Sequence, residues 1–333
     1  RWLTSLLALL IGIGYCMLRG YDAAMFTLSM GIYVYKIVDG MADVYEGRLQ
    51  QADNLYLAGM SQALRSVAVV AVFSVMLFIT RSLPVACVAA GVVAVLSLVF
   101  MTFPLSLLET EKSGPWRMRE VGGLFRQCSP LFSTLFLFNL IESCPKFAME
   151  SMMGYDAQLY FSALFFPAQA ILLAVGFVYK PQLLRLANIW SNPRRRRRFD
   201  LIMLAVMAVI AFMGWIGIDI MSFMYGIDFT EYRMLAFLMV AAGGFTAAID
   251  FLYQIITVLR HQNLATKPYL ISFGAAIVLS IALVHFFDLL GAVLSYLAVM
   301  ALLLVLLTMQ YVRIRGIISR TTGDPFARRP HYK

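Results

Sequence analysis

Charged and polar side chains recur at helical spacing in one otherwise apolar segment of the sequence. The segment NLIESCPKFAMES contains Asn139, Glu142, Lys146 and Glu150. The three charged residues are four positions apart, so a helix places them along one face, and Pro145 interrupts the backbone hydrogen-bond ladder just before Lys146. Such a face can bind an anion at Lys146 while the glutamates pair with the ammonium and orient it. The alternative is a self-neutralised structural pair that only positions the helix.

A second polar stripe has similar spacing. It consists of residues three or four positions apart in KIVDGMADVYEGRLQQ: Lys36, Asp39, Asp43, Glu46 and Gln50. On a helix these residues share one face. We take Lys36, Asp39 and Asp43 as candidates for lining a central cavity, because an ionised side chain inside a membrane usually faces a cavity or a partner. Glu46 and Gln50 are expected to lie in cytoplasmic water.

Further candidates lie in the segment GGFTAAIDFLYQIITVLRHQ. Asp250 is either a proton or cation site or a polar contact between helices. Arg260, about three turns further on, is either a topology anchor or a residue that meets a cargo at the cytoplasmic side. The glycine pair 243–244 allows helices to approach closely. Lipid-facing packing and interface belts are expected to account for most of the aromatic residues in the spans, such as Tyr160, Phe161, Phe165 and Phe166.

The sequence predicts neither a cofactor nor a metal site. The four cysteines form no CxxC motif, the three histidines lack HExxH spacing, and no GxxxxGK[ST] nucleotide-binding motif is present. The predicted outer loops are too short to carry the carboxylates of a membrane glycosyltransferase. We therefore expect a protein that is not an enzyme.

The composition predicts an integral membrane protein built as an all-α bundle. The chain is 61% hydrophobic and 14% charged, whereas soluble domains are about 45–50% apolar and about 25% charged. Continuous apolar runs near the roughly 20 residues of a membrane-crossing helix predict ten spans. We place them at 2–18, 22–40, 66–81, 84–107, 128–151, 157–179, 201–223, 234–258, 268–287 and 289–311.

The distribution of basic residues predicts the orientation. Twenty-two lysines and arginines fall in one set of connections and ends, and three in the opposite set. By the positive-inside rule, both ends of the chain are expected to be cytoplasmic. The arginine run at 194–198 is expected to touch anionic lipid headgroups rather than nucleic acid.

Four segments in order resemble bacterial polysaccharide-transport (O-antigen flippase-like) proteins of lipopolysaccharide biosynthesis. They are DGMADVYEGRLQQADNLYLAGMSQALR, the long segment from NLIESCPKFAMES to YKPQLLRLA, YGIDFTEYRMLAFLMVAAGGF and ITVLRHQ. The pattern N…PK(Y/F)A…D-x-Q…P…P-x-L is met by Asn139, Pro145, Lys146, Ala148, Asp156, Gln158, Pro167, Pro181 and Leu183.

This resemblance implies the fold of the multidrug/oligosaccharidyl-lipid/polysaccharide exporter superfamily, two six-helix lobes around a central cavity. Residues 1–107 would be the remainder of the N-terminal lobe, 108–127 a cytoplasmic linker, 128–312 the C-terminal lobe and 313–333 a cytoplasmic tail. The ten spans would be helices three to twelve, so we expect two further helices upstream of Arg1.

The resemblance also implies a function: flipping an undecaprenyl-pyrophosphate-linked oligosaccharide to the outer leaflet of the bacterial plasma membrane by alternating access. Lys146 would meet the pyrophosphate or acidic sugars, while Glu142, Glu150 and Asp250 would exchange protons or sodium. Polysaccharide polymerases or glycosyltransferases would be partners. The alternatives are a cation-coupled drug exporter of the same superfamily and a non-transporting scaffold of a glycan-synthesis complex.

Overall fold

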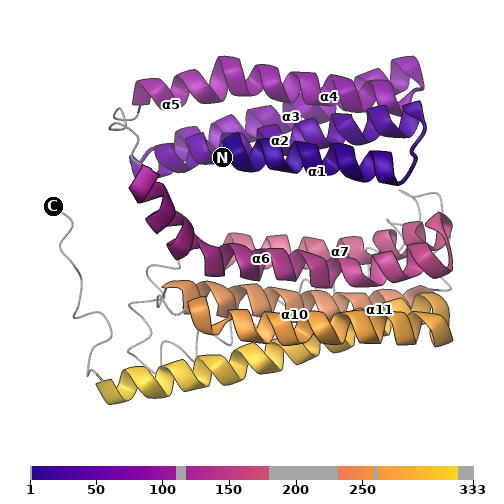
Figure 1. Cartoon of the computed structure of the whole chain (residues 1–333), viewed down its shortest axis with the longest axis vertical. Coiled ribbons are helices and arrows are strands. Elements are labelled where there is room, and N and C mark those ends of the chain that lie inside the picture. The colour runs from indigo at the N-terminus through magenta and orange to yellow at the C-terminus, as the bar shows by residue number, and fades with distance from the viewer. Residues whose placement is uncertain (1, 110–117, 180–231, 259–261, 322–333) are drawn as a thin grey trace. The chain divides into compact units, whose positions relative to one another are not determined.

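The computed structural model describes residues 2–109, 118–179, 232–258 and 262–321. These residues are almost entirely helical and include no strand. The chain divides into two compact units, Arg1–Trp116 and Arg117–Lys333, and each is described by itself (Figure 1). All the predicted spans fall on helices except the one at 201–223, which lies outside the described residues.

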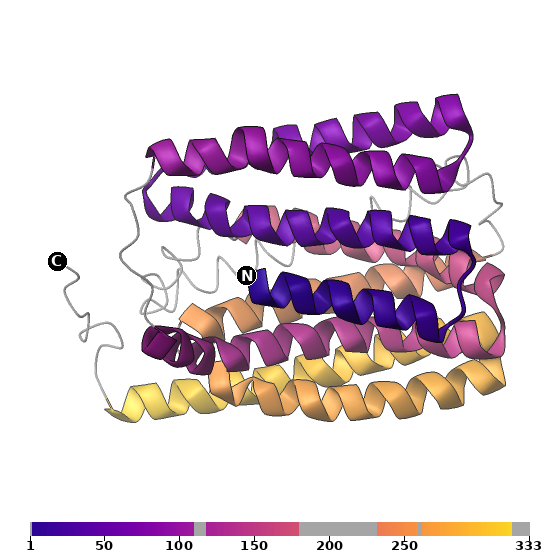
Figure 2. The ribbon, with the colours of Figure 1, turned by 45° about the horizontal axis from the view of Figure 1, so that its top comes forward.

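The first unit consists of helices that lie side by side (Figure 1). In chain order they are α1 (Trp2–Leu18), α2 (Ala23–Gln51), α3 (Leu55–Thr80), α4 (Leu83–Ser97), the π-helix η1 (Leu98–Thr102) and α5 (Phe103–Glu109). The last three are continuous, and we call them the α4–α5 rod. The Asp22 side chain caps α2 by accepting a hydrogen bond of 3.0 Å from the amide of Met25. In both views α2 lies between α1 and the α4–α5 rod (Figures 1 and 2).

The close contact between α2 and α4 depends on glycine. A Cβ atom added at Gly31 would lie 2.7 Å from the carbonyl carbon of Cys87, and one added at Gly91 would lie 3.2 Å from the carbonyl oxygen of Gly31. The two backbones therefore touch directly. Small residues allow this approach between membrane helices, where dispersion contacts drive association.

We expect Gly31→Ala to destabilise the first unit by about 1–3 kcal/mol, the usual effect of overpacking. Gly40→Ala is the matched control on the same helix, because a Cβ at Gly40 meets no atom within 4 Å; alanine there favours the helix by up to about 1 kcal/mol. Thermal unfolding of the detergent-solubilised chain measures both changes. Equal melting temperatures for the two variants would contradict the close packing at Gly31.

The second unit contains α6 (Met118–Met152), α7 (Tyr155–Tyr179), α10 (Arg233–Val258), η4 (Gln262–Leu264) and α11 (Thr266–Thr321). The backbone of α11 is non-helical at Asp288 (φ 51°, ψ −127°), and the helix reverses there into two antiparallel segments (Figure 1). As predicted for the glycine pair, Gly243 of α10 lies against α7, where a Cβ would be 2.6 Å from the Cα of Ala168.

The described residues include five helices long and apolar enough to cross a membrane: Leu55–Thr80, Leu83–Glu109, Ala157–Phe177, Arg233–Val258 and Gln262–Ile314. The predicted membrane class is supported at this level. α2 and α6 are also long, but they carry the two charged stripes. Several helices extend beyond the predicted apolar runs. Helix replaces most of the predicted 41–65 link, and α6 begins inside the predicted 108–127 linker.

Candidate functional site

Glu142 of α6 is the centre of a polar cluster inside the second unit. Its Oε1 atom accepts a hydrogen bond from Gln169 Nε2 of α7 at 3.1 Å and one from the Tyr296 hydroxyl of α11 at 3.4 Å. Tyr296 is 1% exposed, and its hydroxyl also lies 3.1 Å from Thr246 Oγ1 of α10. One carboxylate is thus linked to all the other long helices described in this unit. These four residues are called the Glu142 cluster.

Lys146 lies one turn after Glu142 but interacts with a different group. Its Nζ atom is 4.4 Å from the centroid of the Phe165 ring, a cation–π distance. Phe165 in turn packs edge-on against Tyr296, with ring centroids 5.1 Å apart. The predicted salt bridge between Glu142 and Lys146 is not formed, since no carboxylate oxygen of the described residues lies within 4.0 Å of Lys146 Nζ. Each of the two groups contacts a side chain of another helix instead.

Of the aromatic residues expected mostly to face lipid or the interface, Phe161 and Phe165 do not, since their rings are buried. Helical spacing puts Phe161 and Phe165 one turn apart, and the two rings stack with centroids 6.0 Å apart. Phe166, by contrast, is 53% exposed. The side of α7 that carries Phe165 and Gln169 therefore faces the Glu142 cluster.

The other predicted residues of the second unit are less tightly connected to this cluster. Asn139 is exposed, and its amide donates to the carbonyl of Leu135 on the same helix at 2.8 Å. Glu150 and Asp250 are half-buried, and Asp250 accepts a 3.5 Å hydrogen bond from Gln254. Arg260 lies outside the described residues.

The first unit contains a buried charge network that sequence reasoning missed. Arg65 of α3 is 1% exposed. Its Nη1 atom lies 2.5 Å from Glu46 Oε1, and its Nη2 atom lies 3.0 Å from Asp39 Oδ1, both on α2. Asp39 and Glu46 are seven residues apart, two turns along one face, so a single guanidinium reaches both carboxylates. The three side chains are called the Arg65 network.

Two hydroxyl groups extend the Arg65 network to a third helix. Ser61 Oγ lies 3.3 Å from Glu46 Oε1 and 3.0 Å from Thr102 Oγ1. Thr102 is the last residue of the π-helix η1. A π-helix inside an α-helical rod is frequently found at functional sites. The network therefore joins α2, α3 and the α4–α5 rod.

Some residues of the predicted polar stripe on α2 belong to the Arg65 network, and others are exposed. Glu46, expected in cytoplasmic water, is 4% exposed, because it is paired with Arg65 of α3 inside the unit. Asp39 is partly exposed, with 32% of its side chain accessible. Lys36 and Asp43 are exposed on the surface of the first unit. Spacing alone could not reveal Arg65 as the partner, since it comes from another helix.

The charges of the two clusters differ. One arginine faces two carboxylates in the Arg65 network, so the three ionised groups carry one net negative charge. In the second unit, the Gln169 and Tyr296 side chains that donate hydrogen bonds to Glu142 are neutral, and the ammonium of Lys146 lies over the Phe165 ring. Lys146 can therefore attract an anion without first breaking a salt bridge, and Glu142 can take up a proton or a cation.

Comparison with known proteins identifies no relative: no family model, curated protein or solved structure matches the chain. The residues and their geometry are therefore the basis for a functional conclusion.

Proposed function

We propose that the protein is a membrane transporter, and specifically a flippase that moves a polyprenyl-pyrophosphate-linked oligosaccharide between the leaflets of the bacterial plasma membrane. The observation that carries the proposal is the state of Lys146. It is half-buried in a long helix between apolar neighbours, yet the described residues provide a ring rather than a carboxylate within ion-pair distance. A cation kept in that state is suited to a transient anionic ligand.

The exposed stripe on α2 supports transport rather than a purely structural role. An ionised side chain near the bilayer centre costs roughly 2.5–3.5 kcal/mol on insertion scales. Lys36 and Asp43 are exposed on the surface of the first unit. Burial inside this unit therefore does not offset the cost of placing their charges in a bilayer. The surface that carries them has to face water or polar groups, as the wall of a water-filled pathway does.

The proposed division of roles follows from the contacts. Lys146 binds the phosphate of the cargo, because an ammonium group in a low dielectric attracts an anion strongly. Glu142 exchanges a proton or sodium ion, and Gln169 and Tyr296 hold its carboxylate in place through their hydrogen bonds. Asp39 offers a second exchangeable carboxylate at the partly exposed edge of the Arg65 network.

A cation-coupled drug exporter is the second candidate, and one observation favours it. Glu142 lies beside the aromatic side chain of Tyr296, which itself packs on Phe165. A carboxylate next to aromatic rings is a suitable site for a lipophilic cation. Lys146, one turn away, opposes such a ligand by charge repulsion, and for this reason we place the flippase first.

Deletion of the gene in its host tests the proposal. The lipid-linked sugar pool is quantified, and its membrane face is determined by the access of an impermeant sugar-modifying reagent. Accumulation on the cytoplasmic face, relieved by the wild-type gene, supports the flippase. An unchanged pool together with new sensitivity to cationic dyes supports the drug exporter. If neither changes, transport by this protein is not supported, and the scaffold becomes the better account.

A further inference from the structure

The hydroxyl of Tyr296 is shared between two oxygen atoms of the Glu142 cluster. It lies 3.4 Å from Glu142 Oε1 and 3.1 Å from Thr246 Oγ1, and Tyr296 and Thr246 are each 1% exposed. A tyrosine hydroxyl carries a single hydrogen, so it donates to only one of these two oxygens at a time. The direction of its hydrogen bond therefore depends on the state of Glu142.

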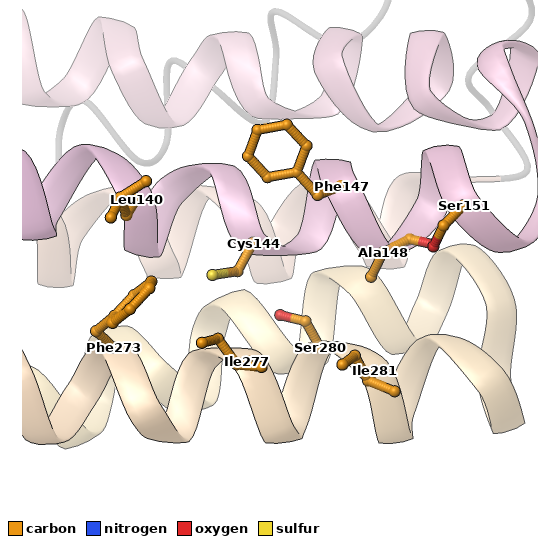
Figure 3. Close-up of a pocket in the computed structure, with 9 residues that line it drawn as sticks. All are labelled: Leu140, Cys144, Phe147, Ala148, Ser151, Phe273, Ile277, Ser280 and Ile281. Atoms are coloured by element: carbon orange, nitrogen blue, oxygen red, sulfur yellow. The ribbon is translucent and has the colours of Figure 1, made fainter. Parts of the chain in front are cut away.

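The partners of Glu142 come from one side of α6. Leu140, Cys144 and Ala148 line a groove of about 330 Å³ between α6 and the first segment of α11 (Figure 3). Glu142 lies two residues from both Leu140 and Cys144, which is a rotation of about 200° around the helix. It therefore faces away from the groove, towards α7 and the second segment of α11, from which Gln169 and Tyr296 reach it.

An ionised Glu142 sets one direction in this chain of hydroxyl groups. A carboxylate only accepts hydrogen bonds, so Tyr296 donates to Glu142 and Thr246 donates to the Tyr296 oxygen. A hydroxyl that donates to an ionised oxygen normally lies about 2.5–2.7 Å from it. The Tyr296 hydroxyl is 3.4 Å from Glu142 Oε1, so the described geometry does not show this short contact.

A protonated Glu142 sets the opposite direction. Its own O–H donates to the Tyr296 oxygen, Tyr296 donates to Thr246, and Thr246 donates to the carbonyl of Ala242 at 2.9 Å. The shorter contact of Tyr296, at 3.1 Å, is then the one to which it donates. The carboxyl still accepts from Gln169. The order of the distances fits this direction, and the chain is complete in both directions.

The groups around Glu142 suit a proton better than sodium. Gln169 of α7 presents an N–H group to the carboxyl, and Tyr296 of α11 an O–H group. A proton leaves both in place, whereas a hard cation binds through several oxygen ligands and would have to displace these donors. The titratable or charged groups that act on Glu142 are Lys146 and Tyr296; α7 and α10 contribute the neutral Gln169 and Thr246.

We propose that the ion exchanged at Glu142 is a proton, and that Tyr296 and Thr246 reverse the direction of their hydrogen bonds when it binds and leaves. The proton forms an O–H bond on the carboxyl, and its release restores the carboxylate. Tyr296 and Thr246 are positioning residues, since they act through Glu142. The inference rests on the proposed function only in taking Glu142 as the ion site.

Infrared difference spectroscopy of the full chain in detergent tests this proposal without a transport assay. Spectra at low and high pH are compared in sodium-free buffer. A carbonyl band of a protonated carboxylic acid should appear at low pH and be lost in Glu142→Gln. A tyrosine C–O band should change over the same pH range, and this change should be lost in both Glu142→Gln and Tyr296→Phe. A tyrosine with a merely structural role would not respond to Glu142.

Two exposed residues of the first unit provide matched controls. Glu109→Gln and Tyr56→Phe remove a carboxyl and a phenol hydroxyl from the surface, and both variants should keep the bands of Glu142 and Tyr296. Thr246→Val removes the other partner of Tyr296 and should diminish the tyrosine change while the acid band remains. Elution as a single species in size-exclusion chromatography shows that each variant is folded.

Addition of sodium at constant pH should leave both bands unchanged. A response to sodium that depends on Glu142, without the acid band at low pH, would overturn the proposal and leave Glu142 as a sodium site. The absence of any band that depends on Glu142 would overturn it too, as would a tyrosine change that persists in Glu142→Gln. If the bands appear but deletion of the gene leaves the lipid-linked sugar pool unchanged, the flippase fails and the proton site stands.

Discussion

Arg65→Met should destabilise the first unit by about 3–5 kcal/mol, the effect of removing one partner of a buried ion pair. The substitution leaves Glu46, 4% exposed, and Asp39 facing each other without the guanidinium that now lies 2.5 Å and 3.0 Å from them. Ser61 remains as a neighbour of Glu46 but cannot balance its charge. The apparent melting temperature and the folded yield of the full chain in detergent measure the loss.

Two further variants make this prediction specific. Arg81→Gln removes an exposed arginine from the same unit and should change stability by less than about 1 kcal/mol, as surface substitutions usually do. Arg65→Met combined with Glu46→Gln should recover much of the stability, because a buried ion pair replaced as a whole is often neutral or better. If Arg65→Met were as mild as Arg81→Gln, the buried network would be refuted.

Loss of the ammonium at position 146 should abolish most of the transport. We expect Lys146→Ala to lower the rate of lipid-linked oligosaccharide flipping by roughly 10- to 100-fold. Removal of a hydrogen bond to a charged group costs about 1.5–3 kcal/mol, and 1.4 kcal/mol corresponds to a factor of ten. Flipping is measured in cells as the fraction of the lipid-linked pool that reaches the outer leaflet.

The controls separate loss of binding from loss of folding. Lys267→Ala removes an exposed lysine near the start of α11 and should leave flipping close to the wild-type rate. Lys146→Arg keeps the positive charge and should restore part of the activity. Variant levels in the membrane are compared by immunoblotting. Wild-type flipping by a well-expressed Lys146→Ala protein would remove Lys146 from the proposed mechanism.

The helices were the most predictable part of this protein, because apolar runs of membrane length have few other stable arrangements. The charged stripe on α6 could also be read from spacing, and Glu142 does occupy the centre of a polar cluster. What could not be read was which helices would meet. Glu46 and Arg65 are nineteen residues apart in separate helices, and each alone resembles a residue at a membrane boundary.

Neutral polar residues were missed for a related reason. Gln169 and Tyr296 each have apolar residues at the positions four before and four after them, and Thr246 shares a helical face with Asp250 rather than with another residue of the Glu142 cluster. The three residues come from three different helices: Gln169 and Tyr296 donate hydrogen bonds to the Glu142 carboxylate, and Thr246 is within hydrogen-bond distance of the Tyr296 hydroxyl. A carboxylate in an apolar span needs donors, so isolated amides and hydroxyls in other spans are the available signal.

The π-helix in the α4–α5 rod determines where this helix can lose a residue without disturbing the helix that follows. One extra residue is accommodated between Leu98 and Thr102, so everything after it is rotated by about 100° relative to an uninterrupted α-helix numbered from the same start. Thr102, the last residue of the π-helix, is buried, and its hydroxyl lies 3.0 Å from that of Ser61. Deleting one residue among 98–101 should therefore preserve the orientation of α5. Deleting one residue in α4 would instead rotate the residues that follow, so that the side chains of α5 would face other neighbours. Natural length variation in this helix is expected to fall within those few positions.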